Sequence, residues 1–221
     1  IDDVAHLAQW YDFRWQLIGN LGVDLLIEPL SRLFGLELGV KLIVMTIPAL
    51  TVAGLLWIAR EVHGRIPATA LFALPLAYSY PFQFGFVNFA LSMALALNGF
   101  ALWLRLARRG RLRLRAVLFV PLSCLLWLCH TFGWGVLGVL AFSAEMIRQH
   151  DLKRGEGWKH WAAAWIRAGL GCLPLASRGL SITTPRNVML ASAIFAITLA
   201  SIAFGLLPAA TGTDTGGSIR Q

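Results

Sequence analysis

The sequence predicts an all-α protein: a polytopic bundle of about six or seven transmembrane helices with an amphipathic helix at the outer membrane interface. Of the 221 residues, 57% are hydrophobic and only 14% are charged. A soluble domain is about half apolar and about a quarter charged. Several windows exceed about 18 apolar residues, which is long enough to cross about 30 Å of hydrocarbon. In lipid, helices satisfy every backbone polar group internally.

Residues 1–37 are expected to form an acidic segment on the outer, periplasmic side. They hold six of the 11 acidic residues, namely Asp2, Asp3, Asp12, Asp24, Glu28 and Glu37. Residues 21–36 repeat apolar side chains at helical spacing, with the polar side chains on one side. That pattern is typical of a helix lying in the membrane interface.

Residues 38–208 are expected to form the transmembrane bundle. Residues 116–144 are too long for one ordinary span, so we divide them near His130, where HTFGWG predicts a turn. Three prolines in residues 66–82 predict an irregular helix supported by its neighbours. The expected spans are 38–58, 66–82, 86–104, the two halves of 116–144, 161–176 (a weaker span interrupted by Arg167) and 188–208.

The basic residues set the orientation. Residues 105–115 contain six arginines, and residues 148–160 form a second basic loop. Cytoplasmic loops are enriched in Lys and Arg, so both loops are expected inside and residues 1–37 outside. The arginine cluster has no interleaved aromatic residues. Contact with anionic membrane lipids therefore explains it better than nucleic-acid binding.

Candidate chemistry gathers on the outer side. Asp2, Asp3 and His6 are spaced so that a helix would place a carboxylate and the imidazole on one face. Such a pair could act as a general base or hold a divalent metal ion as cofactor. Two ligands alone make a poor metal site, so no metal-binding residues are assigned. The alternative is a solvated acidic helix start, which suits the helix dipole.

Two further outer features are candidates for substrate binding. The aromatic segment 78–89 carries the amides Gln83 and Asn88, a combination that binds sugars or lipid headgroups but also forms ordinary interfacial belts. His130 lies at the expected break between two spans. A polar residue in a membrane domain is a functional candidate, although a histidine can also cap a turn.

The segments GFVNFALSMALALNGFALWLRL and LLWLCHTFGWGVLGVL, with WQLIGNLGVDLLIEPLSRLFGLELGVKL before them, resemble a group of bacterial polytopic membrane proteins. Their architecture is similar to that of the C-type glycosyltransferases, which use lipid-linked sugar donors. The resemblance covers about residues 1–150. It implies an acidic base or metal ligand in the first outer loop, which falls here on Asp2 or Asp3 beside His6.

The tail carries a different resemblance. GLLPAATGTDTGGSIRQ, residues 205–221, resembles the amidase signature family, in which the serine of TGGSIR is the nucleophile. That position is Ser218. The second serine motif and the lysine base of the family are missing from this chain, so an unactivated Ser218 in a flexible tail, residues 209–221, is the expected state.

The leading hypothesis is therefore a glycosyltransferase-like protein of the bacterial inner membrane that uses a lipid-linked sugar at the outer face. The alternatives are a non-enzymatic transport or assembly component and a truncated, inactive amidase fusion. Membrane lipids are expected partners, and nucleic acid is not. The chain begins at Ile1 rather than Met, which is typical of a fragment of a longer protein. Its two unrelated resemblances add a fusion, a truncated reading frame or an assembly artefact as further interpretations.

Overall fold

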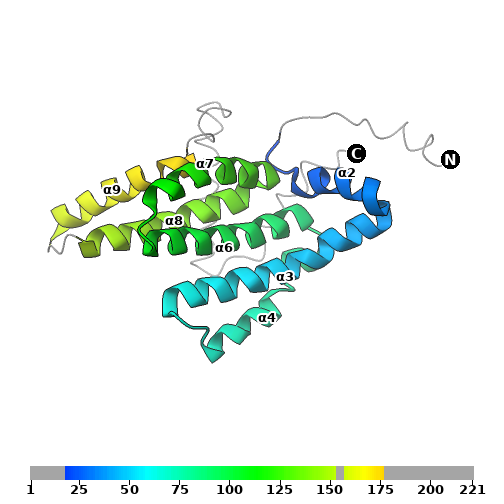
Figure 1. Ribbon diagram of the computed structural model, residues 1–221, viewed down its shortest axis with the longest axis horizontal. Coiled ribbons are helices and arrows are strands. Elements are labelled where there is room, and N and C mark those ends of the chain that lie inside the picture. The colour runs from blue at the N-terminus through cyan, green and yellow to red at the C-terminus, as the bar shows by residue number, and fades with distance from the viewer. Residues whose placement is uncertain (1–17, 153–156, 177–221) are drawn as a thin grey trace.

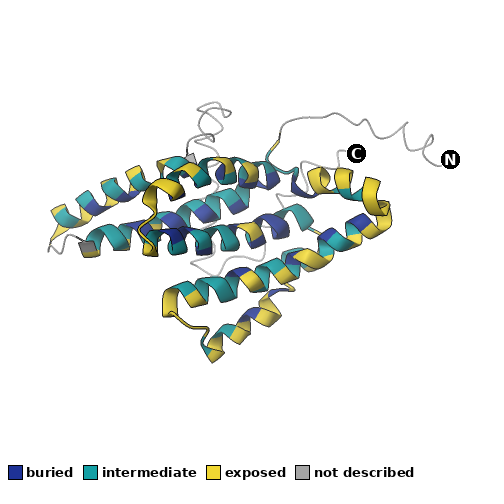
Figure 2. Ribbon diagram, in the orientation of Figure 1, coloured by how far each residue is buried: buried dark blue, intermediate teal, exposed yellow. Residues whose placement is uncertain are grey.

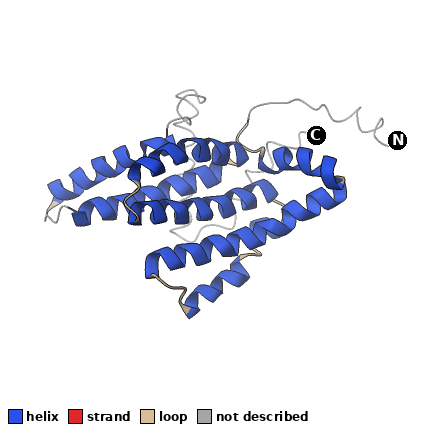
Figure 3. Ribbon diagram, in the orientation of Figure 1, coloured by secondary structure: helices blue, strands red, loops and turns tan. Residues whose placement is uncertain are grey.

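The computed structural model describes residues 18–152 and 157–176, and every regular element within them is a helix (Figure 3). The all-helical prediction is thereby confirmed for this part of the chain. In chain order the elements are α2 (Gly22–Phe34), α3 (Leu36–His63), the 3₁₀-helix η1 (Ala68–Phe72), α4 (Ala73–Leu76), α5 (Tyr80–Gln83), α6 (Val87–Arg108), α7 (Leu112–Cys129), α8 (Thr131–Leu152) and α9 (Trp158–Ala176).

Helix α6 packs against α3 on one side and against α7 and α8 on the other, and α9 packs against α7 and α8 (Figure 1). Helices α3 and α6 run parallel, because Asn98 of α6 donates to Leu50 O at 2.8 Å and Arg108 donates to Glu61 O at 2.8 Å. Helices α7 and α8 are joined by a sharp turn and run antiparallel. The bundle therefore has two ends, one at the α7–α8 turn and one at the α6–α7 turn.

One core cluster fills each half of the bundle. Val23, Ile43, Ile47, Ala90, Leu91 and Cys129 are buried together toward the α7–α8 turn. Trp103 and Phe119 meet edge to face, 4.9 Å apart, in the larger cluster between α6, α7 and α8. A polar link joins three helices inside this second half, where Trp134 Nε1 donates to Ser123 Oγ at 2.7 Å and Ser123 Oγ donates to Leu175 O at 2.6 Å.

Three helices in the described residues are long and apolar enough to cross a membrane, namely α3, α6 and α7. Their outward faces carry large apolar side chains; Met45 is 71% exposed and Val117 is 72% exposed (Figure 2). An apolar exterior on helices of this length is what a hydrocarbon environment requires.

The break at His130 is confirmed, since α7 ends at Cys129 and α8 begins at Thr131. The predicted turn at HTFGWG is confined to His130, because residues 131–135 form the start of α8. The expected helix at 21–36 is also present as α2, which turns into α3 at Gly35 with a φ of +79°. Residues 66–82 differ from the prediction: η1, α4 and α5 are short separate segments. Pro67 precedes η1, Pro75 lies inside α4 and Pro81 lies in the first turn of α5. Proline lacks a backbone donor, which disfavours one continuous helix through this stretch but is tolerated in a first helical turn. The expected span 188–208 lies outside the described residues.

Candidate functional site

The chain before α2 is fastened to the α7–α8 turn by its backbone. Leu21 N–H donates to Leu128 O at 2.9 Å, and Thr131 N–H donates to Gly19 O at 3.0 Å. Gly22 lies directly against Cys129, where a Cβ on residue 22 would collide with the sulfur. We call residues 19–24, Asn88 and 129–131 the His130 end of the bundle.

Asn88 holds this end together through its side-chain amide. Its Oδ1 accepts the Val23 N–H at 2.6 Å, and its Nδ2 donates to Asn20 O at 3.0 Å and toward Asp24 Oδ2 at 3.4 Å. Val23 is the second residue of α2, and the first N–H groups of a helix have no partner within it. The predicted substrate-binding amide therefore caps α2 from a distance of 65 residues in sequence.

His130 is buried, with 8% of its surface exposed, and its backbone is extended between the two helices. Its Nδ1 accepts the Phe132 N–H at 3.1 Å. In a neutral imidazole that bond assigns the ring proton to Nε2, which becomes the donor. The ring meets Phe89 edge to face at 5.7 Å, and Phe89 is the neighbour of Asn88 in α6. Asn88 and His130 thus lie at the same end of the bundle.

The other predicted site residues are not brought into this group. Gln83 is exposed at the end of α5, and its amide donates to Tyr78 O at 2.7 Å. Asp2, Asp3, His6 and Ser218 lie outside the described residues. Within the described ranges, no group of three or more His, Cys, Asp or Glu side chains is arranged to hold a metal ion.

Sequence reasoning missed Asn20 and Asp24, which lie beside Asn88. Within residues 18–152 and 157–176, the buried Asn20 Oδ1 has no hydrogen-bond partner. Buried acceptors without a donor are uncommon in folded proteins, so this oxygen is a candidate ligand contact. No local pattern marks Asn20, because its neighbourhood is created by α6 and α7 packing around it.

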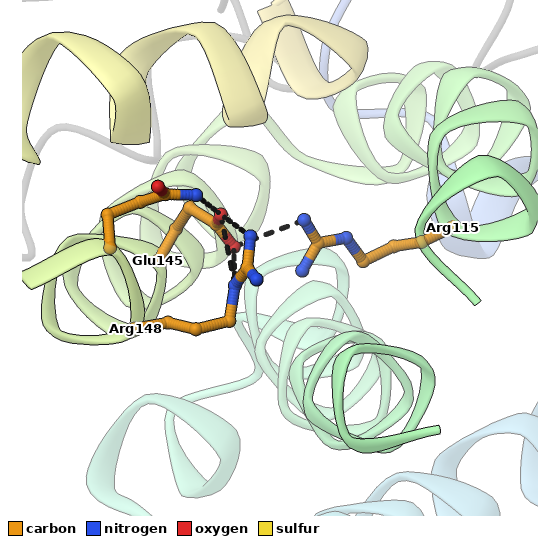
Figure 4. Close-up of polar contacts among 4 residues, drawn as sticks. Arg115, Glu145 and Arg148 are labelled. Carbon is orange, nitrogen blue, oxygen red and sulfur yellow. Dashed lines mark hydrogen bonds and ion pairs between the residues drawn. The ribbon is translucent and has the colours of Figure 1, made fainter. Parts of the chain in front are cut away.

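A charged cluster forms at the opposite end, where α7, α8 and α9 meet (Figure 4). Arg115 Nη2 donates to Glu145 Oε2 at 3.1 Å, and Arg148 Nε donates to both carboxylate oxygens at 3.1 Å. Glu145 is 1% exposed and Arg115 is 4% exposed. Arg115 also lies over the Trp103 ring, with its guanidinium carbon 3.9 Å from the ring centre.

Sequence reasoning missed this cluster as well, although a signal existed. Glu145 is an acidic residue in an otherwise apolar run, and an ionisable residue in a membrane helix marks a functional candidate. Arg115 was grouped with the exposed arginines of the loop 105–115. Its burial follows from its position one turn inside α7, where it faces α6 and α8.

No family model, curated protein or solved structure matches this chain.

Proposed function

We propose that this chain is a polytopic protein of the bacterial inner membrane, with about six or seven spans, that transfers a sugar from a lipid carrier at its outer face. In this proposal residues 1–37 lie outside and the Arg105–Arg115 loop lies in the cytoplasm. The observation that supports it most is the meeting of Asn88 and His130 at the end opposite the arginine-rich turn. The sequence context of both residues predicts that they lie on the outer face.

The chemistry available at the His130 end suits a hydroxyl-rich ligand. Among the described residues, Asn20 Oδ1 is a buried acceptor without a donor, and His130 places an imidazole at the same end of the bundle. Sugar rings carry hydroxyl groups that both donate and accept hydrogen bonds. Small numbers of directed polar groups in an otherwise apolar wall are what fix a ligand's orientation.

The proposed reaction is a glycosyl transfer. The acceptor hydroxyl attacks the anomeric carbon and its proton passes to the carboxylate of Asp3 or Asp2, with His6 beside it. The bond from the anomeric carbon to the lipid phosphate breaks, and the phosphate leaves with the electron pair. A divalent metal ion is the cofactor that would help to neutralise this leaving group. Gln83, Asn88 and His130 are the proposed substrate-binding residues. Asn88 acts in binding by holding α2 in place.

The experiment uses the full chain in lipid nanodiscs with radiolabelled polyprenyl-phosphate hexoses and a membrane-lipid acceptor extract. His130→Ala is expected to lower transfer at least about tenfold, the effect of losing one directed hydrogen bond of 1.4 kcal/mol or more. His150→Ala, the same substitution at the other end of α8, is the control and is expected to leave transfer unchanged. Equal transfer by both variants, or no transfer by the unmodified chain, contradicts the proposal.

A non-enzymatic transport or assembly component is the second candidate, and one observation favours it. The interior between α7, α8 and α9 contains the buried pair Arg115 and Glu145. Ionisable residues that face the inside of a membrane bundle mark ion or substrate pathways in transporters. Uptake of a labelled anion into proteoliposomes, lost in Glu145→Gln and retained in Glu28→Gln, would support this candidate over sugar transfer.

A further inference from the structure

The charged cluster between α7, α8 and α9 has more donors than its one carboxylate can serve. Glu145 accepts hydrogen bonds from Arg115, from Arg148 through both Nε and Nη2, and from Gln149 Nε2 at 2.8 Å. A carboxylate offers about four lone-pair positions. Its acceptor capacity is therefore filled by groups on α7 and α8.

Several buried guanidinium nitrogens are left over. Among the described residues, Arg115 Nη1 and both Nε and Nη2 of Arg167 are buried without a hydrogen-bond partner. A buried cationic donor without an acceptor is strongly unfavourable, more so than a neutral one. Water does not solvate the Arg115 guanidinium, because only 4% of the residue is exposed and the group lies over the Trp103 ring.

Arg167 belongs to the same neighbourhood by its position on α9. It shares a helix face with Gly171, four residues further on, and a Cβ on Gly171 would lie 3.1 Å from Glu145 Cγ. Ala164 and Ala168, three residues before and one residue after Arg167, are fully buried on the side of α9 that packs against the bundle. Because α8 and α9 run antiparallel, Arg167 lies one turn beyond Glu145 in the direction of Arg148. Arg115 and Arg148 therefore contact Glu145 directly, and Arg167 lies next to them along α9 without a bond to the carboxylate.

We propose that Arg115, Arg148 and Arg167 bind a phosphate group between α7, α8 and α9. The four side chains carry a net charge of about +2, which inorganic phosphate of charge about −2 balances in full and a phosphodiester headgroup of charge about −1 balances in part. Guanidinium groups match phosphate oxygens in paired hydrogen bonds. The phosphate takes the donors that Glu145 cannot serve, so the bonds to Glu145 remain intact.

The position of the site fits the phosphate level of a membrane. Arg115 lies in the first turn and a half of α7, a helix long and apolar enough to cross a bilayer. The end of such a helix lies near the headgroups. The cluster is accessible from the surface at Arg148, whose side chain is 29% exposed. The phosphate of a lipid headgroup and free phosphate share this chemistry, and the experiment separates them. Binding here does not depend on the proposed sugar transfer at the other end.

The test measures the thermal unfolding midpoint of the delipidated full chain in dodecyl maltoside, a detergent that contains no phosphate. One arm adds inorganic phosphate and the other adds phosphatidylglycerol. At about 100 times the dissociation constant, we expect the midpoint to rise by about 5–10 °C in at least one arm. A rise with inorganic phosphate assigns a free phosphate ligand, and a rise with phosphatidylglycerol alone assigns a lipid headgroup.

Arg167→Gln is the decisive variant, because Arg167 makes none of the bonds to Glu145. Without ligand it should unfold at the same or a higher temperature, since a buried unpartnered charge has been removed; with ligand its rise should be lost. Arg115→Gln should also lose the rise. Arg113→Gln, an exposed arginine on the same helix with the same change of charge, is the control and should keep it. No rise in either arm, or an equal rise in Arg167→Gln and Arg113→Gln, overturns the proposal.

Discussion

Buried polar groups have different kinds of hydrogen-bond partner at the two ends of the bundle. At the His130 end, neutral side chains bond to backbone atoms. Asn88 accepts the Val23 N–H and donates to Asn20 O, and His130 accepts the Phe132 N–H. At the other end, charged side chains bind each other, and Arg115 Nη1 has no acceptor among the described residues. The neutral end fixes how segments distant in sequence meet, whereas the charged end has more cationic donors than its carboxylate can accept.

This difference predicts that loss of a buried charge at the charged end lowers the free energy of unfolding most. Glu145→Ala leaves Arg115 buried without its counter-ion, and breaking a buried pair from one side costs about 3–5 kcal/mol. Glu28→Ala, which breaks the exposed pair with Arg32, should cost less than about 1 kcal/mol. Denaturant unfolding of the two variants in detergent measures the difference. Similar losses would mean that Glu145 is solvated.

Close backbone approach near the His130 end gives the next largest effect. A Cβ on Gly133 of α8 would come within 2.6 Å of Ser92 Oγ on α6, whereas a Cβ on Gly138 would meet nothing within 4 Å. Gly133→Ala should therefore cost about 1–3 kcal/mol through overpacking. Gly138→Ala, on the same helix, should stabilise by up to about 1 kcal/mol through helix propensity. Unfolding midpoints that move together in the two variants would refute the close contact.

The smallest of these effects sharpens the role of Asn88. Asn88→Ala removes the acceptor of the Val23 N–H, which should cost about 1–2 kcal/mol and increase hydrogen exchange at the start of α2. Gln83→Ala removes only a bond to Tyr78 O on an exposed side chain and should cost less than about 0.5 kcal/mol. If exchange at Val23 is the same in both variants, Asn88 does not cap α2.

What could be predicted from the sequence was local. The turn at His130 follows from the length of an apolar run, and α2 follows from its periodicity, so both were expected before the structure. The fragmentation of 66–82 was underestimated, because the cost of each proline depends on whether neighbouring helices satisfy the freed groups. The meeting of Arg115 with Glu145, thirty residues apart, depends on how α7 packs against α8, which no local pattern specifies.

In the proposed topology, the two ends of the bundle lie on opposite sides of a membrane. Phe84→Cys places a thiol beside α6 at the His130 end, where Phe84 is 63% exposed, and Arg111→Cys places one in the α6–α7 turn. The unmodified chain, with Cys124, Cys129 and Cys172, gives the background. A membrane-impermeant maleimide applied to intact bacterial spheroplasts is expected to label Phe84→Cys directly, and Arg111→Cys only after the membrane is permeabilised. Labelling of both variants from the same side would contradict the account.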